Sequence, residues 1–121
     1  MDSNNDVKVF MEACDQNEVG FNKQAELYFK LIREEFDELV RAYFEKDMVE
    51  IADGCADLKW VIEGLEHTLQ IPQQAVWDEV SRSNLSKISP TGKVLKRDDG
   101  KVLKPEGWTP PDIKKILKEQ G

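Results

Sequence analysis

Two amphipathic stretches follow one another with almost no connecting sequence, and this feature constrains the fold more than any other. Apolar side chains recur every three or four positions over residues 23–46 and again over residues 47–70, so each stretch predicts one long helix. The expected core faces are formed by Tyr28, Ile32, Phe36, Leu39 and Tyr43 in the first helix, and by Ile51, Leu58, Leu65 and Leu69 in the second. Because the connection is so short, the two helices must be antiparallel neighbours. We therefore expect an all-α fold, an antiparallel helical bundle.

The rest of the chain adds shorter elements to one expected domain over residues 1–121. Residues 1–5 are polar and expected to fray, and Val7, Phe10, Met11 and Cys14 then predict a short helix ending near residue 16. Asn22 is suited to capping the helix that follows, and Pro72 to the first turn of a fourth helix reaching about Lys87. Residues 88–121 are expected to form a β-hairpin with Asp-Gly at its tip, then a proline-rich tail with a last helix from about Asp112.

Net charge and apolar content exclude several classes of protein. The net charge of −7 argues against a nucleic-acid surface, because a phosphate backbone needs clustered Lys and Arg. No apolar run approaches 18 residues, and the first residues lack the pattern of a signal peptide. The two cysteines, Cys14 and Cys55, are expected to be reduced, packed thiols of a cytoplasmic protein.

Several carboxylates lie off the solvent face of the first long helix. At about 100° per residue, Lys30, Arg33 and Asp37 share the solvent face. Glu34, Glu35 and Glu38 instead fall in one arc beside the apolar stripe. Three acids so close together repel one another unless a cation neutralises them.

The second long helix repeats this arrangement. Glu50, Asp53 and Asp57 project together, in an arc that also holds Trp60. The small residues Ala52, Gly54, Ala56 and Gly64 would let a neighbouring helix approach closely. Two antiparallel helices with inward acids make a cage of oxygen ligands, which suits Mg²⁺ or Mn²⁺ better than zinc. The alternative is an ordinary solvated charge run.

Polar residues with affinity for phosphate follow in the last third of the chain. Asn84 and Lys87 continue a helical stripe begun by Val76 and Val80. Lys93 and Lys96 belong to a basic segment that also contains Arg97, Lys101 and Lys104. Lysine is a good point charge for phosphate, and asparagine can bond a base or sugar edge. Helix capping and a charged edge hairpin are equally good explanations.

These residues together resemble a known family. Glu34-Glu35-x-x-Glu38 followed by Glu50-x-x-Asp53 is similar to the signature of the MazG-like nucleotide pyrophosphohydrolases. Those enzymes belong to the all-α NTP pyrophosphatase superfamily, with dimeric dUTPases and phosphoribosyl-ATP pyrophosphohydrolases. Ser83-Asn84-x-x-Lys87 and the segments 92–97 and 105–108 resemble a subgroup, so the resemblance spans about residues 21–113.

The resemblance implies a Mg²⁺-dependent enzyme that cleaves a (d)NTP between its α and β phosphates. It implies a bundle completed by dimerisation, either a homodimer or a dimer of dimers. By position, Glu35, Glu38, Glu50 and Asp53 would hold metal, and Glu34 would be a further ligand or the base. Asn84, Lys87, Lys93 and Lys96 would contact nucleotide. Asp57 and Trp60 lie outside the motif and are substrate-binding candidates from the face analysis alone, Trp60 as a stacking wall.

Three alternatives accompany this interpretation. One is a dUTP- or dCTP-specific enzyme of the same superfamily, because base choice depends on pocket shape. Another is a non-enzymatic helical module whose acids form an interaction surface. A di-iron bundle is set aside because it needs two Glu-x-x-His motifs, and the single His67 follows Glu63 by four residues. Neither that histidine nor the cysteines have a triad-like setting, so no covalent nucleophile is expected.

Overall fold

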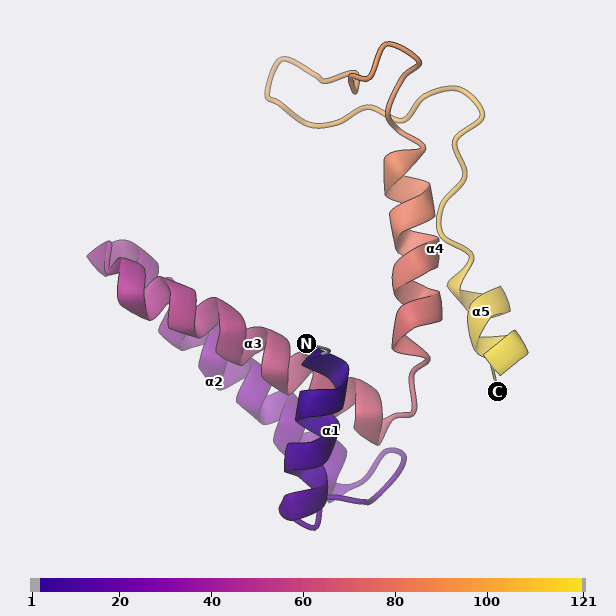
Figure 1. Ribbon diagram of the computed structural model, residues 1–121. Coiled ribbons are helices and arrows are strands. Elements are labelled where there is room, and N and C mark those ends of the chain that lie inside the picture. The colour runs from indigo at the N-terminus through magenta and orange to yellow at the C-terminus, as the bar shows by residue number, and fades with distance from the viewer. Residues whose placement is uncertain (1–2, 121) are drawn as a thin grey trace. The chain divides into compact units, whose positions relative to one another are not determined.

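The structure is a computed structural model in which residues 3–120 are described (Figure 1). This range contains five α-helices and no strand, so the predicted all-α class is confirmed. The helices are α1 (Ser3–Ala13), α2 (Lys23–Glu45), α3 (Met48–Thr68), α4 (Gln73–Leu85) and α5 (Ile113–Gln120). Contacts divide the chain into two compact units, one ending at Ile71 and the other beginning at Pro72. The expected single domain stays a prediction, and each unit is described by itself.

The first unit is built on the expected antiparallel pair, α2 and α3, with α1 packed on α3 (Figure 1). The side chain of Asn22 accepts a hydrogen bond from the backbone N–H of Ala25 at 3.1 Å, which caps α2. Lys46 ends α2 in the left-handed conformation, and Asp47 caps α3 by accepting from the N–H of Glu50 at 3.2 Å. This two-residue reversal sets the antiparallel register.

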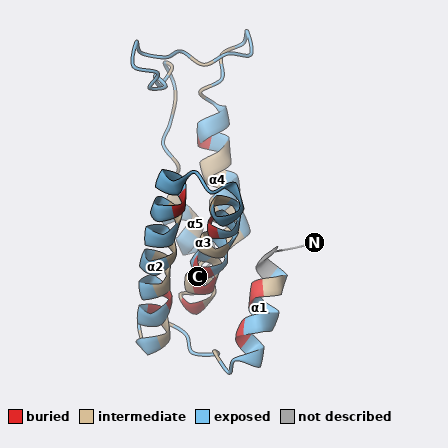
Figure 2. Cartoon of the chain, turned by 90° about the vertical axis from the view of Figure 1, so that its left-hand side faces the viewer, coloured by how far each residue is buried: buried red, intermediate tan, exposed pale blue. Residues whose placement is uncertain are grey.

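The core of this unit is small. Val7, Met11, Tyr28 and Val61 are buried together, and Leu31, Ile32, Leu58 and Leu65 pack around them. Most of the surface of the helices is exposed (Figure 2). The prediction that Phe36 and Tyr43 are core residues is wrong for the single chain, because they are 53% and 66% exposed. One neighbouring helix covers only part of the apolar face of α2.

Two glycines of α3 allow α2 to approach closely, as predicted. A Cβ atom at Gly64 would lie 2.1 Å from Cε1 of Tyr28, so the tyrosine ring occupies the space of a side chain. A Cβ atom at Gly54 would lie 3.3 Å from Cδ1 of Leu39. The contact with Gly64 therefore fixes where α2 and α3 meet.

Two expectations for the first unit are corrected. Residues 3–5 are not frayed but form the first turn of α1, which ends at Ala13 rather than near residue 16; residues 1–2 lie outside the described part. The cysteines are free as expected, but both are exposed, so the expectation of packed thiols is wrong.

Among the described residues, no helix is both long and apolar enough to span a bilayer.

The second unit contains α4, α5 and the segment between them. The chain reverses at Asp98–Gly100 as predicted, and Arg97 and Lys101 are joined there by a 2.8 Å backbone hydrogen bond. In place of the expected hairpin, however, the segment has one isolated antiparallel bridge, between Lys96 and Val102. An isolated two-stranded hairpin is only marginally stable, which accounts for the pairing being limited to this bridge.

Candidate functional site

Four carboxylates from the two long helices form the candidate site. Glu35 and Glu38 lie on α2, and Asp53 and Asp57 lie on α3. Electrostatic interactions link Glu35 with Glu38, Asp53 and Asp57, and link Asp57 with Asp53 and Glu38. These four residues are called the carboxylate cluster. The helical spacing within α2 and α3 and the close packing of the two helices bring them together.

Glu35 is the most enclosed member of the cluster. Burial raises the pKa of its carboxyl group, and the neighbouring Glu38, Asp57 and Asp53 raise it further. Its Oε2 atom is buried and has no hydrogen-bond partner within the described residues. A buried carboxylate oxygen without a partner is costly, so this atom needs a proton or a cation.

Asp57 has a similar environment on α3. Burial raises the pKa of its carboxyl group, and Asp53, one turn earlier, and Glu38 of α2 raise it further. In the described residues no cation is paired with any member of the cluster. The sequence placed Asp57 outside the family motif, but the structure places it inside the cluster.

The donor set of the cluster suits a hard divalent cation. All its ligand atoms would be carboxylate oxygens, which Mg²⁺ and Mn²⁺ prefer, and among the described residues the buried Oε2 atom of Glu35 has no hydrogen-bond partner. As the side chains stand, no three Asp, Glu, His or Cys residues between 3 and 120 converge closely enough to hold an ion. Glu38 and Asp53 are exposed, so their side chains have room to rotate toward one.

The structure does not bring the two remaining predicted acids into the cluster. Glu34 is exposed on α2, and Glu50 is exposed in the first turn of α3. Neither contributes to the interactions that link the other four.

The indole of Trp60, predicted to be a surface on which a base stacks, packs against α1. It meets the ring of Phe10 edge to face, with 5.6 Å between the ring centroids, and is 37% exposed. Its assignment as a stacking surface for a base stays a prediction.

A groove of about 610 Å³ lies on another part of the first unit. Its lining is mainly apolar and comes from the start of α2 and the end of α3, and it includes Phe21, Phe29, Leu65 and Leu69. None of the predicted site residues lines this groove.

In the second unit, the predicted nucleotide contacts lie at and beyond the end of α4. The Nζ atom of Lys87 donates to Oδ1 of Asn84 at 3.1 Å, so these two residues form one polar pair. Lys93 and Lys96 are exposed, and within residues 3–120 their ammonium groups form no hydrogen bond or ion pair. Their roles in nucleotide binding stay predictions.

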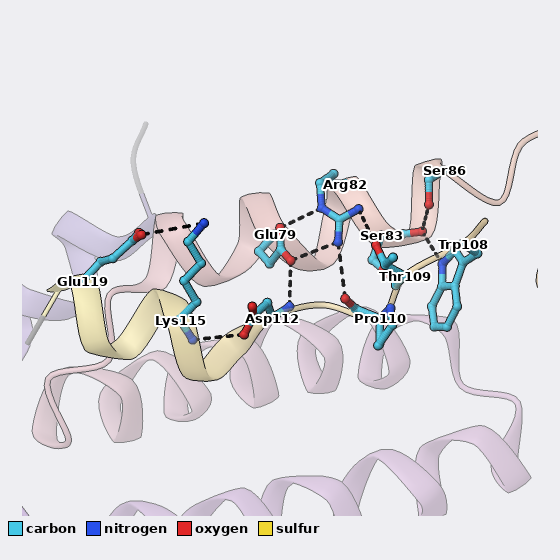
Figure 3. Close-up of polar contacts among 10 residues, drawn as sticks. All are labelled: Glu79, Arg82, Ser83, Ser86, Trp108, Thr109, Pro110, Asp112, Lys115 and Glu119. Carbon is cyan, nitrogen blue, oxygen red and sulfur yellow. Dashed lines mark hydrogen bonds and ion pairs between the residues drawn. The ribbon is translucent and has the colours of Figure 1, made fainter.

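Two further residues lie beside this pair: Lys104, a member of the predicted basic segment, and Trp108, for which no role was predicted. The ring centroid of Trp108 lies 5.4 Å from Nζ of Lys87 and 4.7 Å from Nζ of Lys104. The indole Nε1–H of Trp108 donates to the backbone carbonyl of Ser83 at 2.8 Å (Figure 3). In the sequence, Trp108 belongs to a proline-rich segment and to residues 105–108 of the family resemblance, and neither feature reveals a contact with a helix 25 residues earlier.

Comparison with known proteins identifies a family model that covers most of the chain. The model, described as phosphoribosyl-ATP pyrophosphohydrolase, matches residues 8–84. That range contains the second half of α1, all of α2 and α3 and nearly all of α4, including the whole carboxylate cluster. No curated protein matches the chain.

Proposed function

The chain belongs to the phosphoribosyl-ATP pyrophosphohydrolase family, within the MazG-like all-α NTP pyrophosphatase superfamily, and from this membership we propose its substrate and cofactor. Membership indicates a pyrophosphohydrolase that acts on a nucleotide. The proposed reaction is Mg²⁺-dependent hydrolysis of a (d)NTP between the α and β phosphates, which yields a (d)NMP and pyrophosphate. The proposed role is removal of unwanted nucleotides from the pool.

The observation that carries the proposal is the carboxylate cluster. Four acids face one another across two packed helices, burial raises the pKa of Glu35 and Asp57, and Oε2 of Glu35 has no hydrogen-bond partner among residues 3–120. Such an arrangement weakens the metal-free fold, so a purely structural role does not explain it. An interaction module would have no use for acids directed at one another.

Mg²⁺, with Mn²⁺ as a substitute, is the proposed cofactor. Glu35, Glu38, Asp53 and Glu50 are the proposed ligands, and Asp57 is now a stronger candidate for this role than for substrate binding. When bound, the ion supplies charge neutralisation for the triphosphate and lowers the pKa of a water molecule. The acids would hold that ion, and Glu34 or another carboxylate would accept the proton of the attacking water.

The proposed phosphate and sugar contacts come from the second unit. Asn84 has an amide that can bond a base or sugar edge, and Lys87, Lys93 and Lys96 carry ammonium groups suited to phosphate oxygens. Their support is the resemblance of Ser83-Asn84-x-x-Lys87 to the family pattern, together with the hydrogen bond between Asn84 and Lys87.

Self-association is also proposed. Large apolar side chains remain exposed on α2 and at the α2–α3 turn, and Phe36, Phe44, Met48 and Val49 are each more than half exposed. Apolar surface of this extent is typical of an interface. A homodimer or a dimer of dimers would cover it, and sedimentation analysis at several protein concentrations tests this.

The activity is tested with a panel of phosphoribosyl-ATP and canonical and modified (d)NTPs, with Mg²⁺ present. Wild type is compared with Glu38→Gln and with Asp37→Asn, a matched change on the solvent side of the same helix. We expect Glu38→Gln to lower pyrophosphate release by about 100-fold and Asp37→Asn to leave it unchanged. Absence of turnover with every nucleotide, or equal turnover in both variants, would favour the interaction module.

A further inference from the structure

Trp108 brings two lysines from distant parts of the second unit to one aromatic ring. Lys87 follows α4, whereas Lys104 lies 17 positions later, beyond the reversal at Asp98–Gly100. Their Nζ atoms lie 5.4 Å and 4.7 Å from the ring centroid, within the range of cation–π attraction. The two ammonium groups are therefore no farther apart than the sum of these distances. Lys87 and Lys104 are called the lysine pair, and the indole of Trp108 is called the ring.

The ring itself is held firmly against α4. The carbonyl of Ser83, a residue only 1% exposed, accepts from Nε1–H of Trp108, and the Oγ–H of Ser83 donates to the carbonyl of Thr109 at 2.9 Å. The guanidinium of Arg82 donates to Oγ1 of Thr109 and to the carbonyl of Pro110, at 3.2 Å and 3.3 Å (Figure 3).

The same segment is attached at its other end. Glu79 accepts from the backbone N–H of Asp112 at 2.7 Å and is paired with Arg82 (Figure 3). Residues 108–112 are thus bonded along more than one turn of α4. Hydrogen bonds to α4, rather than the contacts with the two lysines, therefore determine the position of Trp108.

The charges around the ring are unbalanced. Arg82, Arg97 and Lys115 each have a carboxylate partner in this unit, but within residues 3–120 neither Lys87 nor Lys104 forms an ion pair. Residues 1–71 carry 17 acidic and 7 basic side chains, whereas residues 72–121 carry 7 acidic and 10 basic ones. Two like charges held on one ring, with no carboxylate paired to them in the described part of the chain, favour an anionic ligand as the balancing charge.

We propose that Trp108 is a positioning residue that presents Lys87 and Lys104 together to a polyphosphate anion. A carboxylate in its place would neutralise the lysines, whereas the ring face attracts both ammonium groups and leaves their full charge for phosphate oxygens. The identification of that anion as the phosphate chain of a nucleotide rests on the proposed function. Asn84 supports the pair by accepting from Lys87.

The probe for this site is inorganic tripolyphosphate, titrated calorimetrically into the full chain without divalent cations at low ionic strength. Wild type should bind it, and Lys104→Met and Trp108→Leu should each weaken binding by about tenfold. Trp108→Phe keeps a ring and should lose about threefold. Trp77→Leu removes a tryptophan of α4 that is 69% exposed, and it should leave binding unchanged.

A double-mutant cycle separates positioning from general damage to the fold. In a Lys87→Met/Lys104→Met background, Trp108→Leu should have no further effect on the dissociation constant, because the groups that it positions are gone. An undiminished effect of Trp108→Leu in that background would overturn the proposal. So would wild-type affinity in Lys104→Met, or absence of tripolyphosphate binding by wild type. Lys104→Met and Trp108→Phe keep the test decisive if Trp108→Leu does not fold.

The outcome is independent of the test of the proposed function. Tripolyphosphate binding that depends on Trp108 in a protein that hydrolyses no nucleotide would support the anion site and reject the enzyme. Nucleotide hydrolysis that depends on Glu38 in a protein whose lysines do not bind tripolyphosphate would do the reverse. For a functional enzyme, Trp108→Leu should raise KM by about tenfold with little change in kcat, since the lysines would bind ground and transition states alike.

Discussion

The substitution Gly64→Ala should destabilise the protein, although alanine favours helices more than glycine does. The new Cβ atom would lie 2.1 Å from Cε1 and 2.4 Å from Cδ1 of Tyr28, far inside the 3.5–4.0 Å at which carbon atoms pack. Tyr28 is 3% exposed and its hydroxyl donates to Gln16, so the ring cannot turn away without losing its packing and that bond.

The expected magnitude follows from two opposing effects. Overpacking a core costs about 1–3 kcal/mol, and a clash with the body of a buried ring belongs at the upper end of that range. Replacing glycine by alanine inside a helix stabilises the helix by about 1 kcal/mol. The free energy of unfolding should therefore fall by about 2 kcal/mol.

Urea denaturation at 25 °C, followed by far-UV circular dichroism without divalent cations, measures this difference. Gly54→Ala is the matched control, because its Cβ atom would be 3.3 Å from Cδ1 of Leu39, the movable end of a side chain. It should change stability by less than about 1 kcal/mol, since the helical gain offsets a small contact. If Gly64→Ala is as stable as wild type, then α2 and α3 do not meet as closely as described, and the register of the carboxylate cluster is open to revision.

Three further predictions concern charge and polar burial. Glu35→Gln should raise the melting temperature of the metal-free protein by removing a repelled charge, and should also reduce the stabilisation gained from Mg²⁺; calorimetry with and without Mg²⁺ measures both. Thr68→Val should cost about 1 kcal/mol in urea denaturation, because Gln24 would lose the buried hydroxyl to which it donates at 2.8 Å. Hydrogen bonds from Arg82 and from a backbone N–H lower the pKa of Glu79 to about 2. Its ionised form therefore stabilises the second unit above about pH 4.5, and this stabilisation is lost as the pH falls through 2; an NMR titration of its carboxyl carbon with a midpoint near 4.5 would contradict this.

The sequence was sufficient for features determined within a few residues. The periodicity of 23–46 and 47–70, with Asn22 as a cap, predicted the helical pair because hydrogen bonds and capping are local. The arcs of acids predicted that Glu35 and Glu38 lie toward Asp53 and Asp57, and electrostatic interactions between α2 and α3 link these four residues.

Features that depend on distant contacts could not be predicted in this way. Glu34 and Glu50 share the arcs with the other acids, but a helical wheel does not locate the contact line to within one residue, and both lie outside the cluster. Phe36 satisfied the apolar pattern, but burial depends on what covers it. The contact between Trp108 and Ser83 joins residues 25 positions apart, and no local pattern encodes it.

The proposed reaction is hydrolysis of a nucleoside triphosphate between its α and β phosphates. Phosphorus-31 NMR of the reaction products with Mg²⁺ tests it most directly, because it distinguishes the two sites of cleavage. The expected products are nucleoside monophosphate and pyrophosphate in equal amounts, both formed about 100-fold more slowly by Glu38→Gln. Nucleoside diphosphate and orthophosphate, or unchanged triphosphate, would contradict it.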